Sequence, residues 1–331
     1  MRVHILDDWF DTLRALPSFE RLAGHDVVVH NDHLSSAEIL AERLADAEAL
    51  VLFRERTAVT ADLLDRLPSL RLISQRSVYP HVDVEACTSN GVLLCSNMHA
   101  DTPSVAAAEL TFALILASAR QLPAQVASAK AGLWQAGVGK TLRGRTLGLY
   151  GYGRIARAVA GYARAFGMEV VWWASDDGRA RAAADGQRVA ESREAFFGRS
   201  DVVSLHVRLK PATRGIVTAD DLLAMRSGST FVNTSRAALV AEGALETALA
   251  AGRPGTIALD VFGTEPLTDP DDPVLRHPNV IATPHIGFVT EDELDLQFAD
   301  IYDQIVAYAA GSPTNVINAE ALGHPRQKDL A

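Results

Sequence analysis

A strand, a glycine turn and a helix, in that order from residue 146, constrain this chain more than any other stretch. Residues 146–150 form a short β-prone run, after which Gly151, Gly153 and Ala156 complete a G-x-G-x-x-A pattern. In a dinucleotide fold the first glycine permits the tight turn and the second lets the backbone approach a pyrophosphate. The small third residue keeps the helix close to the sheet. The pattern predicts a phosphate-binding turn here.

The residues after the turn support the same interpretation. Apolar side chains recur at helical spacing over residues 155–166, and residues 169–173 are typical of a second strand. The backbone N–H groups at the start of such a helix can donate to phosphate oxygens. We therefore expect Arg154 and Ile155 to bind a dinucleotide together with the two glycines.

The composition bounds the class of protein. The chain has 331 residues, enough for two domains, and its 48% hydrophobic and 22% charged residues are ordinary for a globular protein. A formal net charge of −10 argues against a surface that neutralises nucleic-acid phosphates or anionic membranes. We expect neither of these partners, and no metal.

Targeting signals and cysteine usage indicate a cytoplasmic setting. The first residues reach acids after a few apolar side chains, so we expect no signal peptide. The most apolar helical run, 105–119, is interrupted by Glu109 and is too short to span a bilayer. Two cysteines, Cys87 and Cys95, provide no disulfide framework, and we expect both to be small buried hydrophobic residues.

Strands alternate with helices along most of the chain, which predicts the α/β class with two Rossmann-like, doubly wound domains. Residues 1–97 contain no glycine-rich phosphate loop and therefore suggest a substrate domain. We expect its strands at Arg2–Leu6, Asp26–His30, Ala49–Phe53, Arg71–Ser74 and Val92–Leu94. We expect those of the second domain at Thr146–Tyr150, Glu169–Trp173, Asp201–His206, Thr230–Asn233, Thr256–Asp260 and Val280–Ala282.

The C-terminal part predicts that the first domain is discontinuous. Residues 290–310 read as an amphipathic helix that can return to the first domain, with an apolar face of Leu294, Phe298, Ile301, Ile305 and Tyr308. We expect a flavodoxin-like substrate domain of residues 1–99 plus 289–331. A Rossmann domain that binds NAD(P), residues 100–288, is then inserted into it. From Pro313 onward we expect a loose tail.

A long, mostly apolar helix is expected over residues 101–120. Such a helix must be buried on several sides. An interface between subunits and a central helix between two domains of one chain are equally compatible with the sequence.

Three reactive side chains follow strands on the side where ligands of a doubly wound sheet bind. Arg236 presents a planar fork that can hold a carboxylate with two hydrogen bonds. His285 is a candidate proton donor and acceptor, and a carboxylate such as Glu265 beside an imidazole favours the imidazolium. Taken singly, Arg236 is equally compatible with a surface arginine. A lone histidine after a strand is more often structural, and Glu265 alone is typical of a solvated loop acid.

Four ordered motifs resemble the D-isomer-specific 2-hydroxyacid dehydrogenases. They are Gly151-Tyr152-Gly153-Arg154-Ile155-Ala156, Asn233-Thr234-Ser235-Arg236, Asp260-Val261-Phe262 with Glu265-Pro266-Leu267, and Pro284-His285-Ile286-Gly287. The similarity covers nearly the whole chain, including His81-Val82-Asp83 and Ala108-Glu109-Leu110.

The resemblance implies an NAD(P)-dependent homodimer that acts on a small 2-oxo or D-2-hydroxy acid, with its nucleotide domain inserted into the substrate domain. It assigns Arg236 to the substrate carboxylate, His285 to proton transfer and Glu265 to His285 as a partner. It further implies cofactor contacts at Ser175, Asp176, His206, Thr213, Thr234, Ser235, Asp260 and Gly287.

The chain departs from the family pattern in the loop after the strand at 71–74, where the family usually has glycines. We expect Ser77, Val78 and Tyr79 to bind the substrate, but the bulky Tyr79 and the cationic Arg76 change the pocket. The identity of the substrate therefore does not follow from the resemblance. Arg54, Arg56 and Arg76 are equally compatible with a site for a second anionic group and with solvated surface charges.

A second departure concerns the acid that selects NAD by binding the ribose 2′-hydroxyl about 20 residues after the glycines. The position after the strand holds Ala174, and Ser175 and Asp176 follow. We favour NAD, because Asp176 could reach the ribose and would repel a 2′-phosphate. The alternative is that Ser175 with Arg179 or Arg181 accepts NADP.

Two other functions remain open on the same scaffold. One is a nucleotide-sensing binding protein with weak or no catalysis, although the joint presence of Arg236, Glu265 and His285 argues against it. The other is a phosphoglycerate dehydrogenase, which is a narrower version of the leading hypothesis.

Overall fold

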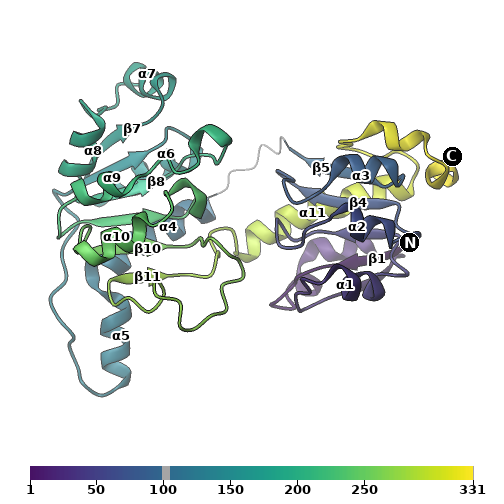
Figure 1. Cartoon of the computed structure of the whole chain (residues 1–331), viewed down its shortest axis with the longest axis horizontal. Coiled ribbons are helices and arrows are strands. Elements are labelled where there is room, and N and C mark those ends of the chain that lie inside the picture. Colours follow the sequence, from purple (N-terminus) through teal and green to yellow (C-terminus); the bar gives the residue numbers. More distant parts are fainter. Residues whose placement is uncertain (99–104, 331) are drawn as a thin grey trace. The chain divides into compact units, whose positions relative to one another are not determined.

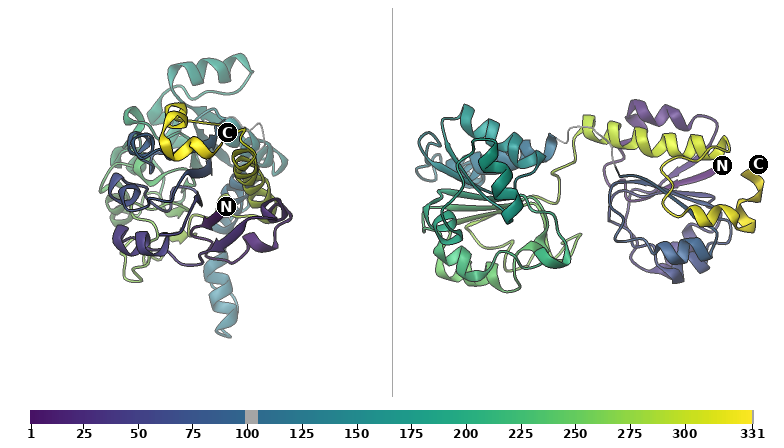
Figure 2. Two further views of the ribbon diagram at one scale, coloured as in Figure 1. Left: turned by 90° about the vertical axis from the view of Figure 1, so that its right-hand side faces the viewer. Right: turned by 90° about the horizontal axis from the view of Figure 1, so that it is seen from above.

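The computed structural model describes residues 1–98 and 105–330, and the chain separates into two compact units. The first unit contains Met1–Thr102 and Thr290–Ala331, and the second contains Pro103–Val289. Each unit has one sheet whose named strands are all parallel. Helices lie on both faces of each sheet (Figures 1 and 2). The predicted α/β class with two doubly wound domains is confirmed.

The sheet of the first unit has the strand order β2-β1-β3-β4-β5, which is the flavodoxin-like order. Each strand expected in this unit is present, with its ends shifted by a few residues. The strands are β1 Arg2–Ile5, β2 Asp26–Val29, β3 Ala49–Val51, β4 Leu72–Arg76 and β5 Leu93–Asn97. The helices are α1 Ala37–Arg43, α2 Ala61–Asp65, α3 Val84–Ser89 and α11 Glu291–Ala309, and the 3-10 turns are Leu13–Ala15, Pro17–Leu22, Ala319–Gly323 and Pro325–Leu330.

Helix α11 packs its predicted apolar face on the sheet of the first unit. All five residues of that face are buried, and Thr290 caps the helix by accepting a hydrogen bond from the N–H of Glu293. Two buried glutamines of the same helix, Gln297 and Gln304, extend the buried face beyond the apolar set. The side-chain amide of Gln304 donates to Ser74 Oγ at 3.1 Å and to the carbonyl of Gln75 at 3.0 Å.

The expected loose tail after Pro313 is wrong. Val316 forms an antiparallel bridge with Cys95, and the carboxamide of Asn318 accepts from the N–H of Leu94 at 2.8 Å. Further along, the side chain of Gln327 donates to the carbonyls of Arg71 and Gly91, both at 2.8 Å. Polar side chains therefore hold this segment against the end of the sheet, a form of attachment that leaves no hydrophobic period in the sequence.

The sheet of the second unit has the order β11-β10-β9-β8-β6-β7. A parallel bridge between Trp172 and Val189 adds a further position outside β7, so the strand order reverses between β6 and β8. The strands are β6 Thr146–Tyr150, β7 Glu169–Trp173, β8 Val202–Leu205, β9 Thr230–Asn233, β10 Thr256–Leu259 and β11 Val280–Ala282. The helices are α4 Ala106–Arg120, α5 Leu122–Lys130, α6 Arg154–Ala165, α7 Asp176–Ala184, α8 Arg193–Arg199, α9 Ala219–Ala224 and α10 Ala244–Ala251, with short 3-10 turns at Pro211–Thr213 and Ala237–Leu239.

Side chains of the second sheet alternate between two hydrophobic cores, as the period of two in a strand requires. Val232 and Ala258 face the core that α4 and α6 cover. Their neighbours Phe231 and Ile257 face the core under α8, α9 and α10. Because both faces are buried, the strands are nearly continuous apolar runs.

Three helices differ from the helices expected from the sequence or extend beyond the described residues. The helix expected over 101–120 is α4, but its first residues up to 104 lie outside the described residues. Helix α5 was not expected, and it has no buried residue in this chain. Helix α7 was not expected either, although Ser175 caps it by accepting from the N–H of Gly178.

Candidate active site

The glycine turn connects β6 to α6 at the point where the strand order reverses. Gly151 has a φ of +115°, and a side chain there would collide with the carbonyl oxygen of His206. Gly153 precedes the first turn of α6, and the space where its side chain would stand is open. Ala156 is fully buried against the sheet. The turn is thus packed against the segment after β8 at Gly151 and open at Gly153, where a pyrophosphate can approach the backbone.

Residues predicted to bind the cofactor also lie at the ends of β7 and β8. Ser175 is the cap of α7, and the exposed Asp176 forms an ion pair with Arg179 in the first turn of that helix. The imidazole of His206 lies 2.9 Å from Ser204 Oγ, and burial lowers the pKa of His206 to about 4. Thr213 accepts from the N–H of Lys210 at 2.8 Å and so closes the turn that follows β8.

The segment after β9 is held from both sides. Thr234 Oγ1 lies 2.7 Å from Thr111 Oγ1 of α4, and Ser235 donates to the carbonyl of Leu205 at 2.6 Å. The carboxamide of Asn233 accepts from the N–H of Ser235 and donates to the carbonyl of Arg236, both at 3.0 Å. These bonds fix the backbone from which the Arg236 side chain extends.

His285 and Glu265 form a direct pair. The Nδ1 atom of His285 lies 2.5 Å from Glu265 Oε2, and Glu265 Oε1 accepts from the N–H of Phe262 at 2.8 Å. Both side chains are about one-third exposed (29% and 33%), so solvent reaches the imidazole. His285 has a φ of +53°, an uncommon conformation for a residue with a side chain and one that is enriched at functional sites.

The electrostatics bring Arg236 into the same group. Burial acts to raise the pKa of Glu265, but the hydrogen bond and charge of His285 outweigh it, helped by the Phe262 N–H and the charge of Arg236. The pKa of Glu265 therefore lies below its ordinary value. The structure thus places His285 against Glu265, and the charge of Arg236 acts on the same carboxylate.

Asp260 supports the loop that carries His285. It is fully buried, and its carboxylate accepts from Thr283 Oγ1 at 2.6 Å and from the N–H groups of Ile286 and Gly287 at 2.9 and 2.8 Å. Burial raises the pKa of Asp260, while these three bonds and the charge of His285 act in the opposite direction. A Cβ atom at Gly287 would lie 3.0 Å from Asp260 Oδ2, closer than an ordinary van der Waals contact.

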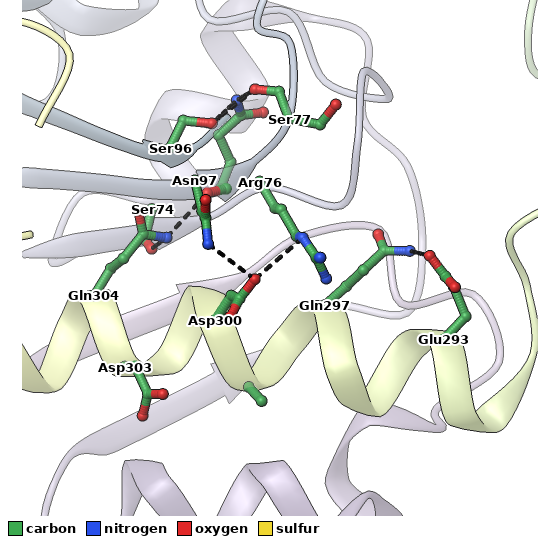
Figure 3. Close-up of polar contacts among 12 residues, drawn as sticks. Ser74, Arg76, Ser77, Ser96, Asn97, Glu293, Gln297, Asp300, Asp303 and Gln304 are labelled. Atoms are coloured by element: carbon green, nitrogen blue, oxygen red, sulfur yellow. Dashed lines mark hydrogen bonds and ion pairs between the residues drawn. The ribbon is translucent and has the colours of Figure 1, made fainter. Parts of the chain in front are cut away.

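The loop predicted to bind substrate lies in the first unit, after β4. Ser77 has a φ of +77°, a left-handed conformation that glycine adopts more readily and that the family's glycines would suit. Its carbonyl accepts from Gln75 Nε2 at 3.0 Å. It also accepts from Ser96 Oγ at 2.7 Å (Figure 3). Val78 is exposed, whereas Tyr79 packs against the hydrophobic core.

The three arginines considered for a second anionic group, Arg54, Arg56 and Arg76, lie in the first unit and differ in their surroundings. Arg76 is buried and points toward α11, where its Nε lies 3.1 Å from Asp300 Oδ2, an oxygen that also accepts from Asn97 (Figure 3). The guanidinium of Arg56 lies 4.1 Å from the ring centroids of both Trp9 and Phe53. Arg54 has a φ of +61°. Arg76 and Arg56 are therefore held by the protein and are not solvated surface charges.

Several residues with a clear role at the site were not predicted. Asn233 and Thr283 hold the backbone of Arg236 and His285, and Phe262 orients Glu265. A signal existed for Asn233, because asparagine at a strand end commonly bonds the backbone two residues on. The role of Thr283 depends on Asp260, which lies 23 residues away in the chain.

Further expectations concern cysteines, metals and membranes. Cys87 and Cys95 are buried thiols, as expected, and burial raises the pKa of each to about 12. Within residues 1–98 and 105–330, no three histidine, cysteine or acidic side chains gather into a group that could hold a metal ion. In the same part of the chain, no helix combines the length and apolarity needed to cross a membrane.

Comparison with known proteins points to one family. Residues 112–287 match the family model described as D-isomer specific 2-hydroxyacid dehydrogenase, NAD binding domain. A solved structure from Ralstonia solanacearum, described as a D-3-phosphoglycerate dehydrogenase oxidoreductase, is 45% identical. The match covers 98% of both chains with a TM-score of 0.93. A phosphoglycerate oxidoreductase from Vibrio cholerae is 43% identical over 93% of this chain and 99% of that one, with a TM-score of 0.88.

A curated relative extends beyond this chain. The D-3-phosphoglycerate dehydrogenase of Methanocaldococcus jannaschii is 36% identical over 295 residues, which cover 88% of this chain and 55% of that protein. The chain thus spans about half the length of the curated relatives it matches.

Proposed function

Because the chain belongs to the D-isomer specific 2-hydroxyacid dehydrogenases, we propose that it interconverts a small 2-oxo acid and the corresponding D-2-hydroxy acid with a nicotinamide dinucleotide. The observation that carries this proposal is the pair of His285 and Glu265, with Arg236 close enough to act on the same carboxylate. An acid–base pair and a carboxylate-binding cation are the two groups that this chemistry needs besides the hydride carrier.

The second unit fits a dinucleotide. Gly151 and Gly153 leave room for the pyrophosphate, and the N–H groups at the start of α6, at Arg154 and Ile155, would donate to it. His206, Thr213, Thr234 and Ser235 lie at neighbouring strand ends or in the turns that follow them. When bound, the nicotinamide supplies or accepts the hydride at C2 of the acid. The family model that matches this unit names NAD, and NADP, which carries one further phosphate, is the alternative.

The chain's own residues supply binding and proton transfer. In the direction of reduction, protonated His285 donates a proton from Nε2 to the carbonyl oxygen at C2. Glu265 remains hydrogen-bonded to Nδ1 during this step. In the direction of oxidation, neutral His285 takes the hydroxyl proton through the same nitrogen. Arg236 binds the substrate carboxylate through its planar fork and so sets the distance from C2 to the imidazole. Asp260 acts on the reaction through the loop and is a positioning residue.

A substrate panel tests the proposal directly. Consumption of NADH and NADPH is followed with glyoxylate, hydroxypyruvate and other 2-oxo acids. The His285→Gln variant should lose turnover with dinucleotide affinity intact, whereas Arg236→Gln should lose both turnover and substrate affinity. Matched controls in the same unit are His277→Gln and Arg276→Gln, which precede β11 in the chain, whereas His285 follows it. Tight dinucleotide binding with no turnover on any 2-oxo acid would point instead to a sensor.

Phosphoglycerate dehydrogenase is the second candidate, favoured by the names of the relatives above. Including 3-phosphohydroxypyruvate in the panel separates it from the broader proposal. A catalytic preference for that compound over unphosphorylated 2-oxo acids would support it. That Ser77, Val78 and Tyr79 bind the substrate stays a prediction, as does a cytoplasmic location.

We further propose that the chain forms a homodimer through α5 and the segment after it. In Figure 1 this helix and its loop extend away from the sheet of the second unit. The helix buries none of its residues in this chain, and Trp134 and Val138 of the following segment are 78% and 90% exposed. Large apolar side chains that gather on a surface mark an interaction site. A second copy of the chain is the partner that the family resemblance implies.

A further inference from the structure

The end of β7 differs from an NAD-selecting strand end. In a Rossmann fold an acidic side chain about 20 residues after the glycines binds the ribose 2′-hydroxyl, whereas a nearby arginine accommodates a 2′-phosphate. Here β7 ends at Trp173, and the next residue, Ala174, has only a methyl group and is 8% exposed. Ser175 uses its hydroxyl to cap α7. The strand end thus presents no carboxylate of its own.

Arg179 occupies this strand end. The centre of its guanidinium lies 4.3 Å from the ring centroid of Trp173, and Nη1 donates to the carbonyl of Ala174 at 3.0 Å. The ring and the carbonyl hold the planar group in place, so less side-chain entropy is lost when it binds a ligand. A guanidinium carries five N–H donors, more than these contacts use, and its geometry matches the oxygens of a phosphate.

We propose that Arg179 binds the 2′-phosphate of NADPH, so that the second unit takes NADPH at least as tightly as NADH. This inference rests on the proposed function, because it assumes that the glycine turn binds a nicotinamide dinucleotide. It revises the expectation that Asp176 selects NAD. Asp176 is almost fully exposed at 95% and stands one turn from Arg179, with which it forms an ion pair.

The acidic groups around Arg179 are too exposed to prevent this binding. An ion pair between solvent-exposed side chains contributes about 0–1 kcal/mol, and a phosphate dianion competes with it favourably. The next acid, Asp177, is itself paired with Arg181 at 3.4 Å. Arg181 and Arg157 both lie about 6 Å from the ring centroid of Tyr152, whose hydroxyl donates to Asp185. The cations Arg157, Arg179 and Arg181 therefore balance the acids Asp176, Asp177 and Asp185.

The test compares dissociation constants for NADPH and NADH, measured by calorimetry and by quenching of tryptophan fluorescence. We expect the wild-type chain to bind NADPH at least as tightly as NADH. The Arg179→Gln variant should bind NADPH about tenfold or more weakly, because a charge-assisted bond to the phosphate is lost. Its affinity for NADH should stay nearly unchanged. The matched control Arg188→Gln, which removes an exposed arginine paired with Glu169 at the other end of β7, should change neither.

A gain-of-function variant completes the design. Ala174→Asp should place a carboxylate at the strand end. We expect it to weaken the binding of NADPH and to strengthen the binding of NADH. The inference is overturned if the wild-type chain binds NADPH more weakly than NADH, or if Arg179→Gln weakens the binding of both dinucleotides equally. Binding of neither dinucleotide would instead refute the proposed function itself, so the two failures are distinguishable.

Discussion

Replacing Asp260 by asparagine is the sharpest test of how the site is built. The substitution keeps the size of the side chain but turns one acceptor oxygen into an NH₂ donor. If the remaining oxygen faces Thr283 and Ile286, the new NH₂ group faces the N–H of Gly287. That buried N–H then loses its partner, which costs about 1–3 kcal/mol. Asparagine carries no charge, so the variant avoids the cost of burying a charged carboxylate, the same cost that raises the pKa of Asp260. This gain offsets a part of the lost stability.

We therefore expect the free energy of unfolding of the second unit to fall by about 1–3 kcal/mol in Asp260→Asn. Turnover should fall more than this loss of stability explains, because the freed backbone includes His285. Urea unfolding can be followed by tryptophan fluorescence, since Trp134, Trp172 and Trp173 lie in the second unit and only Trp9 in the first. Turnover is measured without urea, at a temperature at which the variant remains folded.

A second buried carboxylate of the same unit provides the control. Asp221 accepts from Arg193 and from Thr218, and it has no contact with the loop at 283–287. Asp221→Asn should lower stability by a similar amount and leave the kcat of the folded protein unchanged. The reasoning fails if Asp260→Asn keeps wild-type kcat, or if Asp221→Asn loses kcat to the same extent.

Three further predictions follow from the same contacts. His285→Gln should lower turnover about 10²–10⁴-fold, the usual contribution of a positioned proton donor, while calorimetry shows unchanged dinucleotide affinity. Burial lowers the pKa of His206 and of His30 from 6.5 to about 4, so the unfolded chain takes up protons between these pH values that the folded chain does not. Stability should therefore fall as the pH drops from 6.5 toward 4, and His206→Asn should flatten that fall in urea titrations; a profile unchanged by the variant would contradict this. Trp134→Glu should convert a dimer into a monomer in light scattering, whereas Phe10→Glu, an exposed aromatic residue of the first unit, should not.

The sequence was sufficient for the strands, and it located the segments that carry Arg236 and His285, because both depend on local chemistry. Strands buried on both faces are apolar runs, and β6 to β11 all appear as such. The glycine turn depends on the absence of side chains at Gly151 and Gly153, which is visible directly in the sequence. Arg236 and His285 follow strands directly, so the rule for ligand positions in parallel sheets locates them.

The features that the sequence did not predict depend on tertiary contacts. The segment from Pro313 is attached by Asn318 and Gln327, whose partners are backbone groups more than 200 residues away in the chain. Helix α5 lacks a buried face in this chain, so it has no hydrophobic period to detect. The sequence left both Arg179 and Arg181 open as partners of a 2′-phosphate. The stacking of Arg179 on Trp173, which distinguishes the two, does not follow from their spacing.

The register of three neighbouring strands explains why residues far apart in sequence meet at one site. Leu259 of β10 pairs with Asn233 of β9 on one side and with Ala282 of β11 on the other. The next residues continue the pairing, since Asp260 N–H donates to the carbonyl of Asn233 and Thr283 N–H to that of Leu259. Parallel strands in register end at the same edge, so the segments that carry Arg236, Glu265 and His285 must all leave the sheet there. A shift of one residue in β11 would turn Thr283 away from Asp260, and the loop would lose the anchor that positions His285.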